Sequence, residues 1–315
     1  MQFYPGRYAA IDVGSHSVLL LVADVDDEGR LSRVAEGSRN TRLSERYYVG
    51  HRLIRTARDR TSEAIVDFMR IARRAGADGI AAVGTSVLRE APNSDEFRSQ
   101  VRQETGLPIE VITGEQEAEL AYQGNLHDRR LPPTDGERIV VDIGGGSTEI
   151  VRGLGESILS RQSFPLGAVR LTEQFMRADP PSMAECDTAD RAIEEALAHL
   201  QPLGPRSLLL GSGGTVVNLA AVAKAAGLIT AREVHGAVLQ HSTVAELVDL
   251  FRTLPLKFRK RVPGLEPDRA DVIVAGAMIL HQFMASIGAT SIVVTANGVR
   301  HGCIYAMAQR SLQRQ

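Results

Sequence analysis

The sequence repeats one pattern twice, and this repeat limits the folds open to the chain more than any other feature. Residues 8–25 read YAAIDVGSHSVLLLVADV, and residues 138–153 read RIVVDIGGGSTEIVRG. In both, an apolar run ends in Asp-x-Gly, a small polar turn follows, and a second apolar run begins. This order is typical of strand, turn and strand. Asp12 and Asp142 lie about 130 residues apart, which indicates two duplicated domains rather than a solenoid.

The segments after each repeat alternate between strand and helix patterns. Apolar spacings of three and four predict helices, and short runs rich in Val and Ile predict strands. The polar segment DRRLPPTDGE at 128–137 is a natural linker between the two halves. The predicted strands include 30–36, 109–113 and 157–163, and the predicted helices include 61–75, 94–106, 114–127, 182–201, 242–252 and 268–287.

Composition limits the class of protein. A chain of 315 residues with 43% hydrophobic residues is long enough for about two domains with sizeable cores. Its formal net charge of −2 gives no general attraction to nucleic acid or to acidic membranes. The start lacks a signal-peptide pattern, and the apolar run Val18–Val25 is too short to span a bilayer. We therefore expect a cytoplasmic protein, with Cys186 and Cys303 as inert thiols and no zinc site.

Three glycine turns offer backbone N–H groups without obstruction from a Cβ, and such turns bind anionic oxygens. They are GSHS at 14–17, GGGS at 144–147 and GSGGT at 211–215. None is part of a Walker A loop, and the strand-like segments after the first two exclude a Rossmann fingerprint. A single turn of this kind is also typical of a tight hairpin. Two of them, each preceded by Asp-x in a domain repeat, favour a phosphate cradle.

Carboxylates stand beside these turns, where they would repel a phosphate unless a cation intervenes. Asp12, Asp142 and Glu149 flank the first two turns, and three glutamates (Glu115, Glu117 and Glu119) open a predicted helix. Divalent ions held by carboxylates neutralise phosphate charge, and hydrolysis needs a group that orients or deprotonates water. We therefore expect Asp12 and Asp142 to hold Mg²⁺ and a glutamate to act on water. Acids at a helix start are also ordinary partners of the helix dipole.

Basic residues provide further candidates for phosphate contacts. Arg89 follows the GTSVL turn, and Arg42 follows the first strand pair. The run KFRKR at 257–261 is a compact cationic patch, either a solvated loop or a landing surface for a polyanion.

Seven motifs, taken in order, resemble the exopolyphosphatase/guanosine pentaphosphate phosphatase family (Ppx/GppA) over roughly residues 8–308. They read AAIDVGSHSVLLLVADV, GTSVLREAPN, TGEQEAELAYQG, VVDIGGGSTEIV, FPLGAVRLTEQF, LLGSGGTVVNLA and PGLEPDRADVIVAGAMIL. The resemblance is to the short, two-domain form of the family. It implies an α/β fold with two ribonuclease-H-like domains of the actin, sugar kinase and heat-shock-70 superfamily, and a site in the cleft between them. The domains are expected at 1–130 and 131–300, with a C-terminal helix at about 301–315 packing back on the first.

The resemblance also implies site residues and chemistry. Hydrolysis would release phosphate from the end of inorganic polyphosphate, with Mg²⁺ or another divalent cation as cofactor. Glu117 matches the catalytic glutamate, and Asp142 and Glu149 match the acids that assist metal and water. Asp12 completes the expected metal ligands. The expected substrate-binding residues are Gly14, Ser15, His16, Ser17, Arg89, Gly144, Gly145, Gly146, Ser147, Gly213, Gly214 and Thr215.

The sequence departs from the family pattern at two positions. His16 stands where the first turn usually carries asparagine, and His301 stands where GLREG carries glutamate. Three alternatives stay open: guanosine pentaphosphate (pppGpp) as the main substrate in a stringent response, a nucleotide-binding scaffold without hydrolysis, and a phosphotransferase. The charge balance indicates no specific nucleic acid partner and no membrane partner, and the resemblance implies a possible homodimer.

Overall fold

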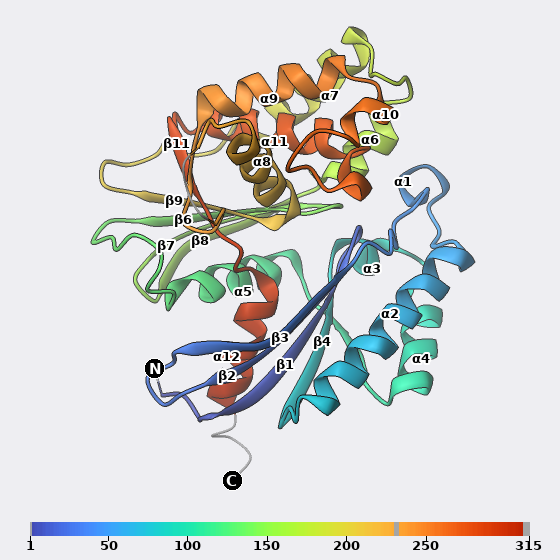
Figure 1. Ribbon diagram of the computed structural model, residues 1–315, viewed down its shortest axis with the longest axis vertical. Helices are drawn as coiled ribbons and strands as arrows, with labels where there is room; N and C mark the ends of the chain where they lie inside the picture. The colour runs from blue at the N-terminus through green and yellow to red at the C-terminus, as the bar shows by residue number, and fades with distance from the viewer. Residues whose placement is uncertain (1, 230–232, 311–315) are drawn as a thin grey trace. The chain divides into compact units, whose positions relative to one another are not determined.

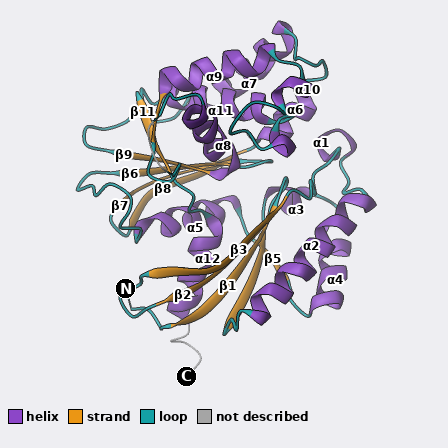
Figure 2. Cartoon of the chain, in the orientation of Figure 1, coloured by secondary structure: helices purple, strands orange, loops and turns teal. Residues whose placement is uncertain are grey.

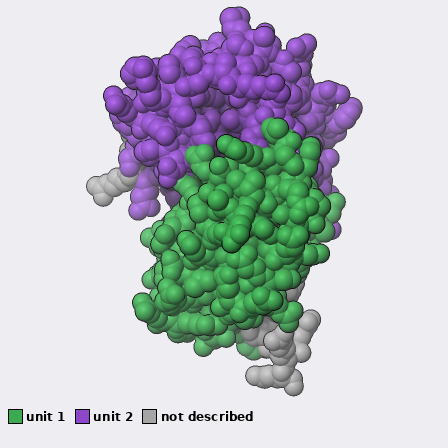
Figure 3. Space-filling view, turned by 90° about the vertical axis from the view of Figure 1, so that its right-hand side faces the viewer, with its two compact units in different colours: residues 1–128, 297–315 green, residues 129–296 purple. Residues whose placement is uncertain are grey.

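The computed structural model describes residues 2–229 and 233–310, and the chain divides into two compact units, coloured separately in Figure 3. Unit 1 contains residues 1–128 and 297–315, and unit 2 contains residues 129–296. Each unit is built on one mixed β-sheet with helices (Figures 1 and 2). None of the helices formed by residues 2–229 and 233–310 combines the length and apolar character needed to cross a membrane.

Unit 1 contains a five-stranded sheet with the order β3-β2-β1-β4-β5. The first three strands are antiparallel, whereas β4 runs parallel to β1 and β5 runs parallel to β4. The strands are β1 (Gly6–Val13), β2 (Val18–Val25), β3 (Leu31–Arg39), β4 (Gly79–Gly84) and β5 (Ile109–Val111), and the helices are α1 (Tyr47–Gly50), α2 (Arg55–Arg74), α3 (Ser86–Glu90), α4 (Ser94–Thr105), α5 (Gly114–Leu126) and α12 (Val299–Arg310).

The two faces of this sheet are covered by different helices because side chains alternate along each strand. On one face Leu21 of β2 packs into a cluster with Ile304 of α12. On the other face, a Cβ on Gly37 would lie 2.7 Å from the Phe68 ring of α2, so this helix packs directly on β3. The C-terminal helix thus belongs to unit 1, and residues 311–315 of its predicted range lie outside the described residues.

Unit 2 repeats the same topology with one strand added. Its sheet has the order β10-β11-β9-β6-β7-β8, in which β8-β7-β6-β9-β11 reproduces β3-β2-β1-β4-β5. The predicted α/β duplication is therefore confirmed. The strands are β6 (Arg138–Ile143), β7 (Thr148–Leu154), β8 (Ser157–Phe164), β9 (Leu208–Ser212), β10 (Val238–Gln240) and β11 (Ser291–Val294), and the helices are α6 (Ala168–Phe175), α7 (Met183–Leu197), α8 (Gly213–Ala225), α9 (His241–Thr253), α10 (Leu256–Arg259), the 3₁₀ helix Pro267–Arg269 and α11 (Ile273–Ser286).

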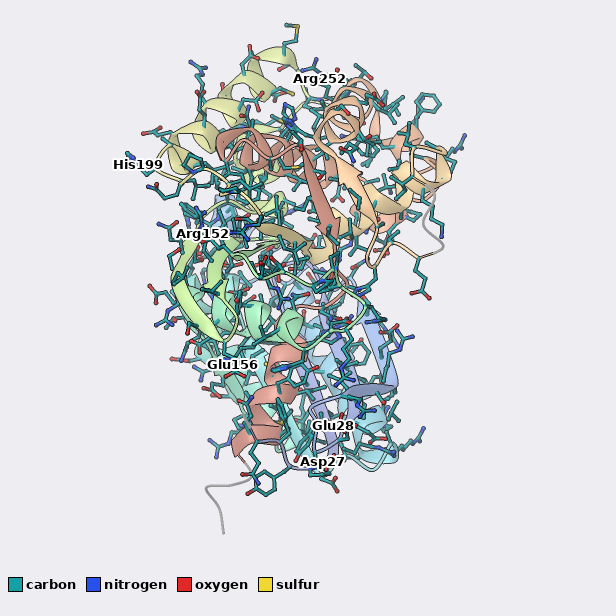
Figure 4. All side chains as sticks on the ribbon, turned by 90° about the vertical axis from the view of Figure 1, so that its left-hand side faces the viewer. Asp27, Glu28, Arg152, Glu156, His199 and Arg252 are labelled. Atoms are coloured by element: carbon teal, nitrogen blue, oxygen red, sulfur yellow. The ribbon has the colours of Figure 1, made fainter. Side chains whose placement is uncertain are left out.

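The side chain of Arg152 attaches the first residues of unit 2 to the sheet of that unit. Arg152 of β7, labelled in Figure 4, pairs with Glu137 at 2.6 Å and donates to the carbonyls of Gln201 and Pro202. One guanidinium therefore links the residue before β6, strand β7 and the segment before β9.

Some predicted elements differ from those observed. Helix α2 begins at Arg55, six residues before the predicted start at 61, and the predicted helix 268–287 divides into a 3₁₀ turn and α11. Helix α6 was not predicted. It begins where backbone carbonyls of the second glycine turn accept its first N–H groups, which is a tertiary contact rather than a local signal.

Candidate active site

The first glycine turn, residues 14–17, joins β1 to β2 and is held on one side by backbone hydrogen bonds. The amide of Gly14 donates to the carbonyl of Ser17 at 3.0 Å, which closes the turn. The carbonyls of Ser15 and His16 accept the amides of Ser44 and Arg42 at 3.0 and 2.8 Å. Because N–H and C=O point in opposite directions across a trans peptide, the amides of His16 and Ser17 point away from this support. They form a small concave set of donors.

The His16 side chain is part of a series of side-chain hydrogen bonds that starts in this turn. The hydroxyl of Ser17 donates to Asn40 Oδ1 at 2.7 Å, so its lone pair is the acceptor for His16 Nδ1 at 3.1 Å. This pattern assigns the proton of a neutral His16 to Nδ1. The turn also buries the Ser15 hydroxyl, which makes no hydrogen bond within the described residues.

Two further predicted residues lie at the same edge of the unit 1 sheet. Strands β1, β4 and β5 are parallel, and Val13, Gly84 and Val111 align at their carboxyl ends. Arg89 follows β4 on α3, and Glu117 follows β5 in the first turns of α5. They form an ion pair of 2.6 Å, and Arg89 also donates to the carbonyl of Ile112 at 3.0 Å. Glu117 is only 8% exposed, so the pair holds its carboxylate in one orientation.

The second glycine turn, residues 144–147, repeats the geometry of the first. Gly144 donates to the carbonyl of Ser147 at 3.0 Å, as Gly14 does to Ser17. Carbonyls of the turn accept the first amides of α6 and, at 2.7 Å, the Arg170 guanidinium. The amides of Gly145, Gly146 and Ser147 therefore point away from α6 and form a second set of donors. The buried Ser147 hydroxyl has no hydrogen-bond partner among the residues described.

Two carboxylates stand beside the second turn on one face of the sheet. Asp142 of β6 lies directly opposite Glu149 of β7, and opposed residues of an antiparallel pair point to the same side. Glu149 is buried and accepts a hydrogen bond of 2.7 Å from the Ser163 hydroxyl. Burial raises the pKa of Asp142 to about 6, and a hydrogen bond from Ser212 partly opposes this shift. Asp142 is thus a carboxylate whose ionisation is costly in the protein alone.

The third glycine turn places the start of α8 against Asp142. Gly213 has a φ of +89°, and a Cβ on it would lie 2.7 Å from Asp142 Oδ1 and 2.5 Å from the carbonyl oxygen of Ile143. The amides at the start of α8, including those of Gly214 and the buried Thr215, receive no side-chain cap from Ser212 and add the positive end of a helix dipole. The structure thus brings the second and third turns together within unit 2.

We predict that Gly213→Ala lowers the free energy of unfolding by about 2–4 kcal/mol, because strain at positive φ adds to steric overlap with Asp142 and Ile143. Urea unfolding measures the change. Gly155→Ala is the matched control, since Gly155 has a φ of +55° but open space around its Cβ, and should lose only about 1 kcal/mol. Equal losses in the two variants would show that close approach to Asp142 does not matter.

Two arginines that the sequence analysis did not select lie near predicted site residues, Arg269 at the third turn and Arg300 near Asp12. The Arg269 guanidinium packs over Gly214, where a Cβ would lie 2.2 Å from its Cζ, and it also pairs with Glu266 at 3.1 Å. Arg300 donates to the carbonyl of Leu20 at 3.1 Å; burial lowers the pKa of its guanidinium, and the nearby Glu36 and Asp12 oppose this. The motifs PDRAD and GVRHG contain both residues, but spacing alone does not locate them.

The cationic run 257–261 does not act as one patch. Arg259 is turned inward on the short helix α10, where it is 4% exposed and pairs with Asp179 at 2.9 Å. Lys257 lies over the Phe258 ring at 4.9 Å, and Lys260 and Arg261 are exposed. The central arginine is therefore structural, which weakens the landing-surface hypothesis.

The carboxylates fit Mg²⁺ by chemistry, although they do not form a closed cage. Within the described residues, no three His, Cys, Asp or Glu side chains form a group that could hold an ion. Mg²⁺ usually takes one or two protein carboxylates and completes its shell with water and substrate phosphate oxygens. The opposed pair Asp142 and Glu149 meets that requirement in unit 2, and Asp12 supplies a carboxylate beside the first turn of unit 1.

Comparison with known proteins places the chain in a family. A family model described as Ppx/GppA phosphatase family matches residues 21–311. Exopolyphosphatase 2 of Mycobacterium tuberculosis is 31% identical, over 96% of this chain and 98% of that protein. The crystal structure of the Aquifex aeolicus Ppx/GppA family member is 33% identical, with a TM-score of 0.80 over 98% of this chain and 99% of that one. An exopolyphosphatase structure from Cytophaga hutchinsonii, at 23% identity and a TM-score of 0.85 over 96% and 98% of the two chains, shares the fold. The chain therefore belongs to the Ppx/GppA phosphatase family.

Proposed function

We propose that this protein is an exopolyphosphatase that removes the terminal phosphate of linear inorganic polyphosphate with the help of Mg²⁺. The observation that carries the proposal is the second glycine turn. It presents three amides and a buried, unsatisfied hydroxyl beside two opposed carboxylates. Buried polar groups in native proteins are rarely left without partners, and phosphate oxygens would supply one for Ser147. Membership of the family and the names of its relatives support the same substrate class.

The proposed reaction is a single displacement at phosphorus. Glu117 orients a water and takes its proton as the water oxygen bonds to the terminal phosphorus. The phosphoanhydride bond breaks, and its electron pair leaves on the bridging oxygen of the shortened chain. The turn amides and Ser147 hold the phosphate oxygens. The expected ligands of Mg²⁺ are Asp142 and Glu149 in unit 2 and Asp12 in unit 1, and the ion would supply the charge that lets these carboxylates lie near a polyanion.

Arg89 has two uses in this scheme. In the absence of substrate its ion pair of 2.6 Å orients Glu117. Its guanidinium carries five N–H donors, and its Nη1 donates to both Glu117 and the Ile112 carbonyl. A phosphate oxygen would compete for this guanidinium and release the carboxylate to accept a proton from water.

A phosphate-release assay tests the proposal. The purified chain is given short, medium and long polyphosphate, and separately pppGpp, each with Mg²⁺ or with EDTA. Metal-dependent release from polyphosphate is the expected result. Release from pppGpp alone would make the protein a pppGpp 5′-phosphohydrolase with the same groups. Tight ATP binding without release from either substrate would overturn the hydrolase proposal in favour of a scaffold.

We also predict that Ser147→Ala leaves stability within about 0.5 kcal/mol of the wild type but raises KM for polyphosphate about tenfold. The hydroxyl has no partner to lose in the protein alone, whereas the substrate would lose a hydrogen bond. Thr148→Val is the matched control, because the neighbouring hydroxyl donates to the Leu166 carbonyl at 2.6 Å. That variant should lose about 1–2 kcal/mol of stability with little change in KM. An unchanged KM in Ser147→Ala would remove this residue from the site.

A further inference from the structure

Unit 1 contains a cavity that the proposed reaction does not use. It has a volume of about 380 Å³, within the range of small-molecule sites. Helices α5 and α12 form two of its walls, and strands β4 and β5 form the third. These elements all lie in unit 1, so the cavity belongs to a single compact body.

The lining of this cavity has an apolar floor and an acidic, amide-rich rim. The buried part of the lining, here called the floor, includes Val83, Ile112 and Cys303, with the partly buried Met307. The rim carries the carboxylates of Glu110 and Glu119 together with three glutamine side chains. Lysine, arginine and histidine are absent from the described residues that line it.

The rim is organised by hydrogen bonds within α5. Gln123 donates to Glu119 at 3.3 Å, one helical turn away. The side-chain oxygen of Gln116 caps the amide of Thr113 at 2.8 Å, so its NH₂ group remains as a donor toward a ligand. Gln116, Glu119 and Gln123 follow a spacing of three and four, which puts them on one face of the helix.

The same helix carries Glu117 on another side. Glu117 is buried against Arg89, while its neighbour Gln116 faces the cavity. Helix α5 has little freedom to adjust against α12, because a Cβ on Gly302 would lie 2.1 Å from the Leu120 carbonyl and one on Gly124 would lie 2.6 Å from the Gly298 carbonyl. A molecule that wedges between this helix pair and strands β4 and β5 would therefore shift α5 and α12 together as one rigid element.

We propose that this cavity is a binding site for an organic cation, an amine with an apolar body, and that its occupation alters the position of Glu117 through α5. The apolar floor takes the body, and the carboxylates of Glu110 and Glu119 take the ammonium group. The same carboxylates would repel phosphate and polyphosphate in the absence of a bridging cation. The effect on hydrolysis rests on the proposed function, whereas binding does not.

Three probes that share a phenylalkyl body and differ in the end group test the binding step: 4-phenylbutylamine, 4-phenylbutanol and 4-phenylbutyrate. Each is titrated into the full chain and followed by calorimetry and by NMR. We expect the amine to bind most tightly and the carboxylate not to bind. Glu119→Gln should weaken binding of the amine about fivefold and leave binding of the alcohol unchanged. Ala306→Phe should block binding of both the amine and the alcohol. Thermal unfolding checks that this variant is folded. Equal binding of amine and carboxylate, or no binding of either, would overturn the proposal.

Cys303 gives a second readout that does not depend on hydrolysis. In a Cys186→Ser background, Cys303 is the remaining thiol, and its alkylation by iodoacetamide should slow as the amine fills the cavity. The amine should also change kcat for phosphate release by severalfold in the wild type but not in Ala306→Phe. An unchanged kcat with the amine bound would overturn the link to Glu117. If no substrate is hydrolysed at all, calorimetry and alkylation still decide whether the site exists.

Discussion

Glu117→Gln is expected to reduce phosphate release from polyphosphate by a factor on the order of 10²–10⁴, the usual contribution of a positioned general base. Glutamine has the same shape and can still accept the hydrogen bond that Arg89 donates at 2.6 Å. It cannot take a proton from water. The loss should therefore appear in kcat, with little change in KM or in thermal stability. Initial rates over a range of polyphosphate concentrations separate these effects.

Glu115→Gln is the matched control for this variant. Glu115 lies in the same first turn of α5 but is exposed, and it is not among the residues placed at the candidate site. It should keep the wild-type rate. A Glu117→Gln variant with the wild-type rate would remove Glu117 as the base, and a loss of similar size in both variants would point to the charge of the helix start instead.

Asp142→Asn is expected to abolish most activity and, at neutral pH, to make the folded protein more stable. The pKa of Asp142 is raised from 3.8 to about 6, a difference that corresponds to at most about 3 kcal/mol of destabilisation when the group is ionised. Asp142 keeps some exposed surface, so the measured gain should fall below this limit. Asparagine removes the buried charge, but it also removes a predicted metal ligand, and we expect the rate to fall by about 10²-fold or more.

The pH window of this stability gain follows from the direction of the shift. The folded protein binds the Asp142 proton more tightly than the unfolded chain does, so this group makes wild-type stability fall as pH rises from about 4 to about 6. Below about pH 4 both states are protonated, and the variant should show no advantage. Above about pH 6 the full advantage should be present. Urea unfolding of both proteins at pH 4, 6 and 8 tests this, and an advantage that is equal at every pH would contradict the buried-charge explanation.

Activity should follow the same carboxylate. As pH falls through about 6, protonation of Asp142 removes a negative ligand, and the apparent affinity for Mg²⁺ should decrease. Higher Mg²⁺ should therefore move the acidic limb of the rate profile to lower pH. A limb that does not move with Mg²⁺ would separate Asp142 from metal binding.

The sequence predicted much of the architecture because its signals are local. The two Asp-x-Gly motifs lie between runs of β-branched and aliphatic residues, and each run became a strand: Gly6–Val13 and Val18–Val25 at the first motif, Arg138–Ile143 and Thr148–Leu154 at the second. The glycine turns were visible because positive φ and close approach require glycine, as at Gly213. Helix α6 was missed, since its start depends on carbonyls of residues 144 and 145, more than twenty positions upstream.

The chain's own sequence was enough to predict two duplicated α/β domains, three glycine turns and a set of acidic residues, because each of these depends on a few neighbouring residues. Tertiary structure alone decided which groups meet. Arg89 reaches Glu117 because β4 and β5 are parallel neighbours, and the pKa of Asp142 rises because burial beside α8 removes water. Likewise, Arg259 leaves the surface to pair with Asp179, eighty positions away. Contacts and desolvation depend on distances in space between residues far apart in the chain, which no local pattern encodes.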